Sequence, residues 1–155
     1  MVTHVRDEIK QTRPFASREQ EAHVSLGRTW AVVEHAFSEA LKPYGITPTQ
    51  YNVLRILRGA GEQGLCRSEV MERMIAKVPD ATRLLDRMEA AGLIGRERDA
   101  ADRRFVTTRI TGEGLRLLGE LDEPVHELHR QHFGALDEEH LRSLIKLLGR
   151  IRGSV

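Results

Sequence analysis

The residues from 79 to 110 constrain the fold most, because the spacing of their apolar side chains changes from that of a helix to that of a strand. On a helical wheel, Ala81, Leu84, Leu85, Met88 and Ala91 fall on one side, and Pro79, Thr82, Arg83, Asp86 and Arg87 fall on the other. Gly92 can adopt the left-handed conformation that ends a helix. A turn at residues 99–102 is then followed by β-branched and aromatic types up to Ile110. The sequence therefore predicts an amphipathic helix with one wholly polar face, followed at once by a β-hairpin.

Three helices are predicted before this one. The first follows a polar lead and carries an apolar stripe with spacings of three and four, formed by Leu26, Trp30, Val33, Phe37 and Leu41. It ends at Lys42-Pro43-Tyr44-Gly45, because proline disfavours a helical conformation at the residue before it. Thr47 and Gln50 form a capping box that begins the second helix. A short third helix is predicted to carry Val70, Met74 and Val78 on one side and to end at Pro79.

Two more helices are predicted after the hairpin. Thr111 can cap a fifth helix, which is striped with leucines and continues through a kink at Pro124. Asp137 can cap a sixth helix that has glutamates in its first turn and arginines in its last, in agreement with the helix dipole. We therefore expect a mainly α fold with a small β-hairpin.

Composition excludes several classes of protein. A chain of 155 residues that is 40% hydrophobic and 30% charged is expected to form one folded domain with appended helices. It has no run of about 18 apolar residues that could cross a bilayer and no apolar signal segment at its start, so we expect a cytoplasmic protein with no membrane partner. Cys66 is the only cysteine, which excludes an intrachain disulfide and a cysteine-rich metal site.

The order of the elements indicates a nucleic-acid partner. Three short helices followed by a two-stranded hairpin is the order of a winged helix-turn-helix. Arg83 and Arg87 on the polar helix face could reach phosphates and base edges, and five arginines lie between Arg96 and Arg109. The net charge of +1 does not by itself favour DNA. A solvated, ion-paired surface is the alternative explanation for these arginines.

The segment from Thr47 to Thr111 resembles the MarR family of bacterial transcription regulators. From Pro79 to Gly114 the chain reads PDATRLLDRMEAAGLIGRERDAADRRFVTTRITGEG, which is similar to the PD-x-TRLLDR-x-E-x-GL string of the family's recognition helix. The family's wing pattern, D-x-R followed by a strand and T-x-x-G, is matched by Asp102, Arg104, Thr111 and Gly114. The order of all six helices also agrees, so the resemblance covers nearly the whole chain after the polar lead.

The resemblance implies a set of DNA-binding residues. They are Pro79, Thr82, Arg83, Arg87, Arg96, Asp102, Arg103 and Arg104. The first four would lie on the recognition helix and face the major groove, and Arg104 at the wing tip would line the minor groove, oriented by Asp102. A narrow minor groove concentrates negative potential and attracts a guanidinium. Asp86 is unfavourable near phosphates, and we expect it to pair with Arg83 or with a wing arginine.

The resemblance also implies a homodimer. We predict a polar lead at 1–17, a dimerisation helix at 18–46, a winged helix-turn-helix DNA-binding lobe at 47–111, and C-terminal dimerisation helices at 112–155. The apolar stripes of the long helices need a surface to pack on, and a second copy would supply it. The alternative is that these helices cap the domain within one chain.

The function implied is that of a transcription regulator, expected to be a repressor, that binds a near-palindromic operator in double-stranded DNA. By resemblance, a small aromatic or phenolic effector could enter a cleft between the dimerisation helices and the DNA-binding lobe. Candidate lining residues are Trp30, His35, Phe37, Tyr44 and Tyr51. For the first four of these, packing in the core or at the dimer interface is the alternative role.

Other functions have fewer residues in their favour. His126, His129 and His132 lie three apart and could bind a metal, but no cysteine accompanies them. Cys66 lies near a helix start, where backbone amides can lower the pKa of a thiol, so a redox response is a further alternative. The chain has no phosphate-binding loop, nucleophile elbow or zinc-protease motif, and we expect no enzymatic activity, no cofactor and no metal. A winged helix that binds only proteins is the remaining alternative.

Overall fold

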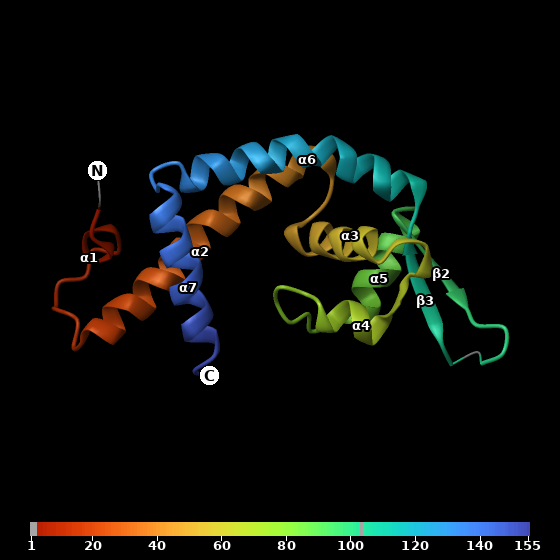
Figure 1. The fold of residues 1–155 in the computed structure, drawn as a ribbon, viewed down its shortest axis with the longest axis horizontal. Helices are drawn as coiled ribbons and strands as arrows, with labels where there is room; N and C mark the ends of the chain where they lie inside the picture. The colour runs from red at the N-terminus through yellow and green to blue at the C-terminus, as the bar shows by residue number, and fades with distance from the viewer. Residues whose placement is uncertain (1–2, 103) are drawn as a thin grey trace.

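The computed structural model describes residues 3–102 and 104–155. It is mostly helical, with one three-stranded antiparallel sheet (Figure 1). In chain order the elements are α1 (Val5–Glu8), α2 (Arg18–Leu41), α3 (Pro48–Ala60), β1 (Leu65–Cys66), α4 (Arg67–Glu72), α5 (Ala81–Ala90), β2 (Ile94–Arg98), β3 (Val106–Ile110), α6 (Gly112–Phe133) and α7 (Glu138–Arg152). The predicted fold class, a mainly α winged helix-turn-helix with long helices at both ends, is confirmed.

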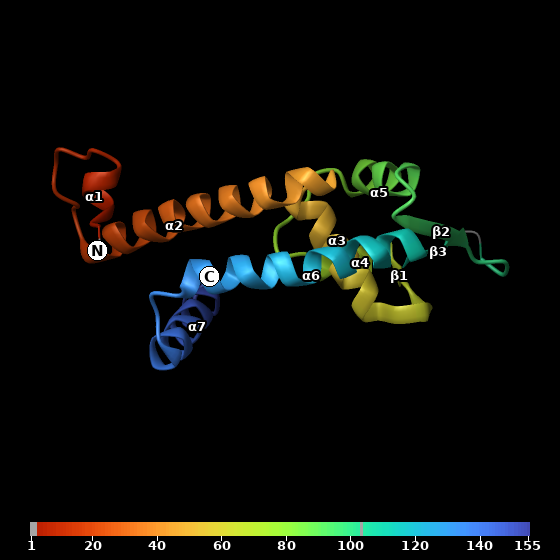
Figure 2. The same ribbon diagram turned by 90° about the horizontal axis from the view of Figure 1, so that it is seen from above.

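The long helices and the small lobe occupy different parts of the molecule. Helices α2 and α6 run alongside each other, and helices α1 and α7 lie at the end away from the hairpin of β2 and β3 (Figures 1 and 2). Helices α3, α4 and α5 and the sheet form the lobe at the other end (Figure 1). Among the helices that the structure describes, none combines the length and the apolar character needed to cross a membrane.

Local capping groups set most helix boundaries. The Thr47 side chain accepts from the Gln50 amide at 3.2 Å, and the Gln50 side chain accepts from the Thr47 amide at 3.0 Å, which completes the predicted capping box. The Thr111 hydroxyl accepts from the Gly114 amide at 3.1 Å, and the α6 helix continues through Pro124. Because these bonds satisfy amides that lack helical partners, each fixes where its helix begins.

The sheet contains one strand more than the predicted hairpin. Its order is β1-β3-β2, with Ile94 opposite Ile110 and Leu65 opposite Thr108. Strand β1 has only two residues, too few to show an alternating pattern in the sequence. Its pairing with β3 ties the base of the hairpin to the start of α4.

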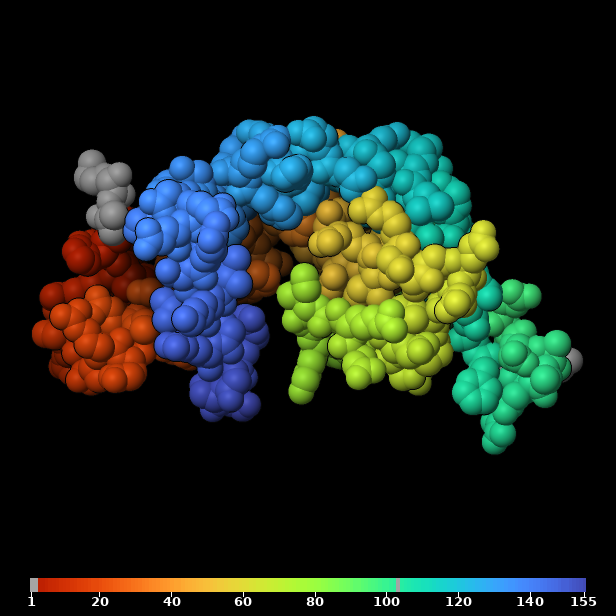
Figure 3. Space-filling view, viewed as in Figure 1, coloured from red at the N-terminus to blue at the C-terminus, as the bar shows by residue number. Residues whose placement is uncertain are grey.

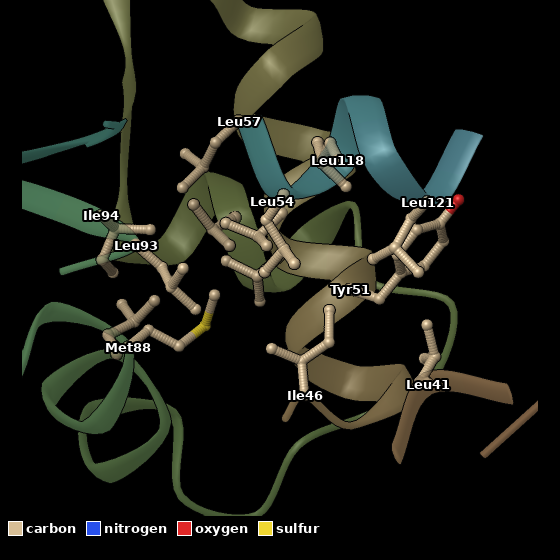
Figure 4. Packing of buried hydrophobic residues seen from close by; sticks show 14 of the residues in the cluster. Leu41, Ile46, Tyr51, Leu54, Leu57, Met88, Leu93, Ile94, Leu118 and Leu121 are labelled. Carbon is tan, nitrogen blue, oxygen red and sulfur yellow. The ribbon is translucent and has the colours of Figure 1, made fainter. Parts of the chain in front are cut away.

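The hydrophobic core joins the lobe to the long helices (Figure 4). Its fully buried side chains include Leu41, Leu54, Leu57, Val70, Leu85, Met88, Ile94, Leu118 and Leu121. Burial of a side chain of this size contributes about 1.5 to 3 kcal/mol to folding. Since α5 supplies two of these residues and α6 two others, α5 is fixed on the scaffold from its inner side.

The third helix is shorter than predicted. Helix α4 ends at Glu72, so Met74 and Val78 lie in the loop between α4 and α5. The amide of Ile75 donates to Oδ1 of Asn52 at 2.9 Å, and this bond takes the place of a helical bond to the carbonyl of Met71. The end of α4 therefore coincides with a contact to α3 and comes well before Pro79, the residue at which the sequence predicted it.

The predicted polar lead contains an element that the sequence did not indicate. Residues 5–8 form the short helix α1, in which Val5 is buried and Glu8 pairs with Arg28 of α2 at 3.2 Å. Lys10, at φ 53°, turns the chain after α1. The lead is thus folded back against α2, because one apolar residue and one ion pair attach it there.

Candidate nucleic-acid interface

Helix α5 has the two faces that its sequence predicts. Leu85 and Met88 are buried, whereas Thr82, Arg83, Asp86 and Arg87 are exposed. Oδ1 of Asp80 accepts from the amide of Arg83 at 2.9 Å and begins the helix. Gly92, at φ 73°, ends it, and the Leu93 amide donates to the Met88 carbonyl at 3.0 Å.

Pro79 is not on the recognition helix, and that part of the prediction is wrong. The helix begins at Ala81 with Asp80 as its cap, so Pro79 lies one residue before the cap. The carboxylate of Asp80 supplies the capping bond that places the start here. Pro79 therefore belongs to the loop that leads into α5.

Two arginines of α5 are available to a partner. Among the residues that the structure describes, the side chains of Arg83 and Arg87 form no ion pair or hydrogen bond. Thr82 is held in place, because its hydroxyl accepts from Nη1 of Arg67 at 2.8 Å. A guanidinium without an internal partner can bind phosphate or a base edge without first breaking a bond.

The wing tip presents one further arginine. Arg104 is 89% exposed, and its guanidinium binds Asp102 through Nη2 to Oδ2 at 2.9 Å and Nε to Oδ1 at 3.1 Å. The bond from the Arg104 side chain, followed by that from its amide, lowers the pKa of Asp102. The side chain of Asp99 accepts from two turn amides and closes the tip. The geometry agrees with an orienting role of Asp102, and Arg103 lies outside the described residues.

Arg96 differs from Arg83 and Arg87 because it is bound within the protein, and from Arg104 because most of its side chain is covered. Its guanidinium pairs with Asp86 at 2.5 Å and with Glu89 at 2.6 Å, and its side chain is only 23% exposed. The bond to Glu89, and then that to Asp86, raises the pKa of Arg96. Asp86 thus pairs with a wing arginine, which was one of its two expected partners.

Arg67 is a basic residue of this surface that the sequence reasoning missed. It lies at the first position of α4, in a cleft with Thr82, Arg96 and Arg104. The segment that resembles the recognition-helix and wing motifs begins only at Pro79, so the motif gave no signal for it. Its proximity to α5 arises from the packing of α4 on the sheet and on α5.

A second hollow lies between the lobe and the long helices. A cavity of about 250 Å³ is lined by residues of α2, α3, α6 and the loop before α5, below α6 in the space-filling view (Figure 3). Trp30, Phe37 and Tyr51 are in the lining, and the rings of the last two meet edge to face at 5.3 Å. His35 is exposed on a side of α2 that does not face the cavity, and Tyr44 packs against the core. Neither residue therefore lines the cavity.

Basic side chains outnumber acidic ones in the lining of this cavity. Its polar residues include Glu34, Asn52, Arg55, Lys77, His129 and His132. Burial, then the positive charge of neighbouring groups including Arg55, lowers the pKa of His129. Nδ1 of His132 is buried and has no hydrogen-bond partner within 3–102 and 104–155. Among the described residues, no three histidine, cysteine or acidic side chains form a group that could hold a metal ion.

The capped helix with a polar outer face, the hairpin with an arginine at its tip and the sheet that joins them define a winged-helix DNA-binding protein. The model of the MarR family matches residues 44–104. The chain is 30% identical over 140 residues to the HTH-type transcriptional regulator YkoM of Bacillus subtilis, covering 86% of this chain and 88% of that protein. The chain belongs to the MarR family of transcriptional regulators and is not an enzyme.

Solved structures agree with this assignment. A MarR transcription factor from Planctomyces limnophilus is 35% identical, with a TM-score of 0.69 over 88% of this chain and 98% of that one. A mutant MarR from E. coli complexed with operator DNA is 25% identical, with a TM-score of 0.73 over 87% of this chain and 99% of that one. Structures of the family therefore include complexes with DNA.

Proposed function

We propose that this chain acts in the cytoplasm as a homodimer that binds a near-palindromic operator and represses transcription. DNA binding by α5 is supported by one observation above all. Arg83 and Arg87, which are unpaired among the described residues, lie on the exposed face of a helix whose other face is buried. Two such helices related by a two-fold axis would meet successive turns of the major groove. A repressor would act by occupying this DNA.

The apolar surface of α7 supports the dimer. None of the residues of α7 is buried, although the helix carries six leucines and isoleucines, and Ile145 is 67% exposed. The accessible surface of the chain is 11580 Å², whereas a compact monomer of this length would expose about 7,900 Å². Obligate dimers commonly bury about 2,000 Å² or more in total. A second copy packed on the long helices would cover such an area.

Charge on the apolar face of α7 should therefore separate the two copies. We expect the double variant Leu148→Glu/Ile151→Glu to sediment as a monomer at micromolar concentration and to bind DNA at least about 100-fold more weakly, because paired half-sites need both lobes. Ser143→Glu, on the polar side of the same helix, is the matched control and should remain dimeric. A wild-type protein that sediments as a folded monomer would contradict the proposal.

We propose that the cavity between the long helices and the lobe binds the effector, a small aromatic molecule with an acidic group. The aromatic rings of Trp30, Phe37 and Tyr51 provide an apolar wall, and the cations Arg55 and Lys77 outnumber the single carboxylate of the lining. A hydrogen bond from a cation to a carboxylate is stronger than one between neutral groups. The loop lining the cavity leads directly to Asp80, the cap of α5, so a ligand there could shift the recognition helix.

The probe for this proposal is 6-hydroxynicotinic acid, which is named as regulating DNA binding by BpsR of Bordetella bronchiseptica. Trp30 is the only tryptophan and lines the cavity, so its fluorescence should change on binding. We expect Arg55→Gln to weaken binding about tenfold, the loss typical of a charged hydrogen bond. The neutral amide of the same acid is the control. Equal binding of the acid and the amide would contradict an acidic effector.

A further inference from the structure

Arg96 connects the wing to the recognition helix through a dense set of bonds. From strand β2, its Nε and Nη2 donate to Oε2 of Glu89 at 2.9 and 2.6 Å, and Nη2 also donates to Oδ1 of Asp86 at 2.5 Å. Its backbone amide donates to Oε1 of Glu89 at 3.2 Å. Both acceptors are on α5. One guanidinium thus binds two carboxylates of the helix proposed to contact DNA and offsets part of their negative charge.

These carboxylates oppose DNA binding unless they are neutralised. Asp86 is exposed on the same face as Arg83 and lies three residues after it, which is a spacing at which side chains of a helix pair with each other. An unneutralised Asp86 would therefore compete for the Arg83 guanidinium. It would also repel a nearby phosphate, and the repulsion grows as water is excluded from between the two charges.

The exposure of Arg96 distinguishes it from a direct DNA contact. Its side chain is 23% exposed, whereas that of Arg104 at the wing tip is 89% exposed. Both donor nitrogens used by Arg96 already face carboxylate oxygens of the same molecule. A phosphate that took over Nε or Nη2 would break these bonds and leave Asp86 and Glu89 unpaired beside the DNA.

We propose that Arg96 is a positioning residue for DNA recognition: it holds Asp86 and Glu89 away from the phosphates and leaves Arg83 and Arg87 available for DNA. This inference rests on the proposed use of the exposed face of α5. The arginine acts through its two carboxylate partners and makes no contact with the DNA. Removal of the carboxylates should therefore make the arginine dispensable.

The test compares three variants on a DNA duplex selected from a random-sequence library by the wild-type protein. Arg96→Gln should weaken binding roughly 10- to 100-fold, because each lobe of the dimer loses the positive charge that faces its two carboxylates. The double variant Asp86→Asn/Glu89→Gln should bind at least as tightly as the wild type. The triple variant that combines these changes should return to within about threefold of the wild type. Melting temperatures, measured in parallel, check that each variant is folded.

Other patterns would overturn the inference. If Asp86→Asn/Glu89→Gln loses as much affinity as Arg96→Gln, the bonds are only a structural brace between α5 and β2. If the triple variant stays as weak as Arg96→Gln, Arg96 contacts DNA itself. Arg116→Gln is the matched control, because Arg116 also binds two glutamates, Glu113 and Glu120, but lies on α6. This variant should bind DNA with the affinity of the wild type. Failure of Arg83→Ala to weaken binding would instead contradict the proposed function.

Discussion

Replacement of Arg83 with alanine is expected to weaken operator binding by about 1 to 3 kcal/mol per half-site and to relax the preference for particular bases. Arg83 is on the exposed face of α5 and has no internal ion pair among the residues that the structure describes, so its loss removes a contact and leaves no carboxylate unpaired.

Arg104→Ala should behave differently, because a guanidinium in the minor groove responds to groove width. Its loss should weaken binding most where the flanking sequence is rich in A·T pairs.

A salt titration of both variants on operator and scrambled DNA measures these effects. If Arg104 also neutralises a phosphate, its removal should reduce the salt dependence by about one ion per wing. Arg142→Ala is the control for lost charge, since Arg142 pairs with Glu138 on α7, outside the lobe. Unchanged binding by Arg104→Ala on every sequence and at every salt concentration would show that the wing is not a DNA contact.

Gly114→Ala is expected to destabilise the fold by about 1 to 3 kcal/mol, a typical cost of forcing an atom into a packed position. Gly114 is buried in the first turn of α6, where that turn passes Leu93 and Ile110. A Cβ added there would come within 2.7 Å of Cγ1 of Ile110 and would also collide with the carbonyl oxygen of Leu93. This close approach is the physical reason for glycine at the last position of the T-x-x-G pattern.

Thermal unfolding followed by circular dichroism, at one fixed protein concentration, measures the loss. Gly119→Ala is a matched control in the same helix, because a Cβ at that position meets nothing within 4 Å. Since alanine is the better helix former, this change should raise the free energy of unfolding by up to about 1 kcal/mol. Equal stability of the two variants would contradict the packing of α6 against Leu93 and β3.

The elements that the sequence predicted well are those whose ends depend on neighbouring residues. The capping bonds of Thr47, Thr111 and Asp137 each span three residues, and Gly92 ends α5 by its own conformation. The end of α4 was predicted wrongly because it involves Asn52, which is 23 residues from its partner in sequence. Strand β1 was missed for the same reason, since only its pairing with β3 makes it a strand.

In the candidate site, too, features set by neighbouring residues were predicted, and features set by tertiary contacts were not. The polar face of α5 follows from helical spacing and was predicted from the sequence. The internal role of Arg96 depends on how the hairpin lies against α5, which neither spacing nor the motif specifies. The cavity draws residues from three helices and a loop, so the sequence indicated Trp30 and Phe37 but gave no reason to place His129 beside them.

Selection of duplexes from a random-sequence library by the wild-type protein tests directly whether two recognition helices of a dimer read DNA together. We expect enrichment of a near-palindrome whose half-site centres are about 10 base pairs apart, because two recognition helices should lie about 34 Å apart. The Leu148→Glu/Ile151→Glu variant should fail to enrich it. Enrichment of a single asymmetric site, or of no sequence at all, would show that the two helices do not read DNA together.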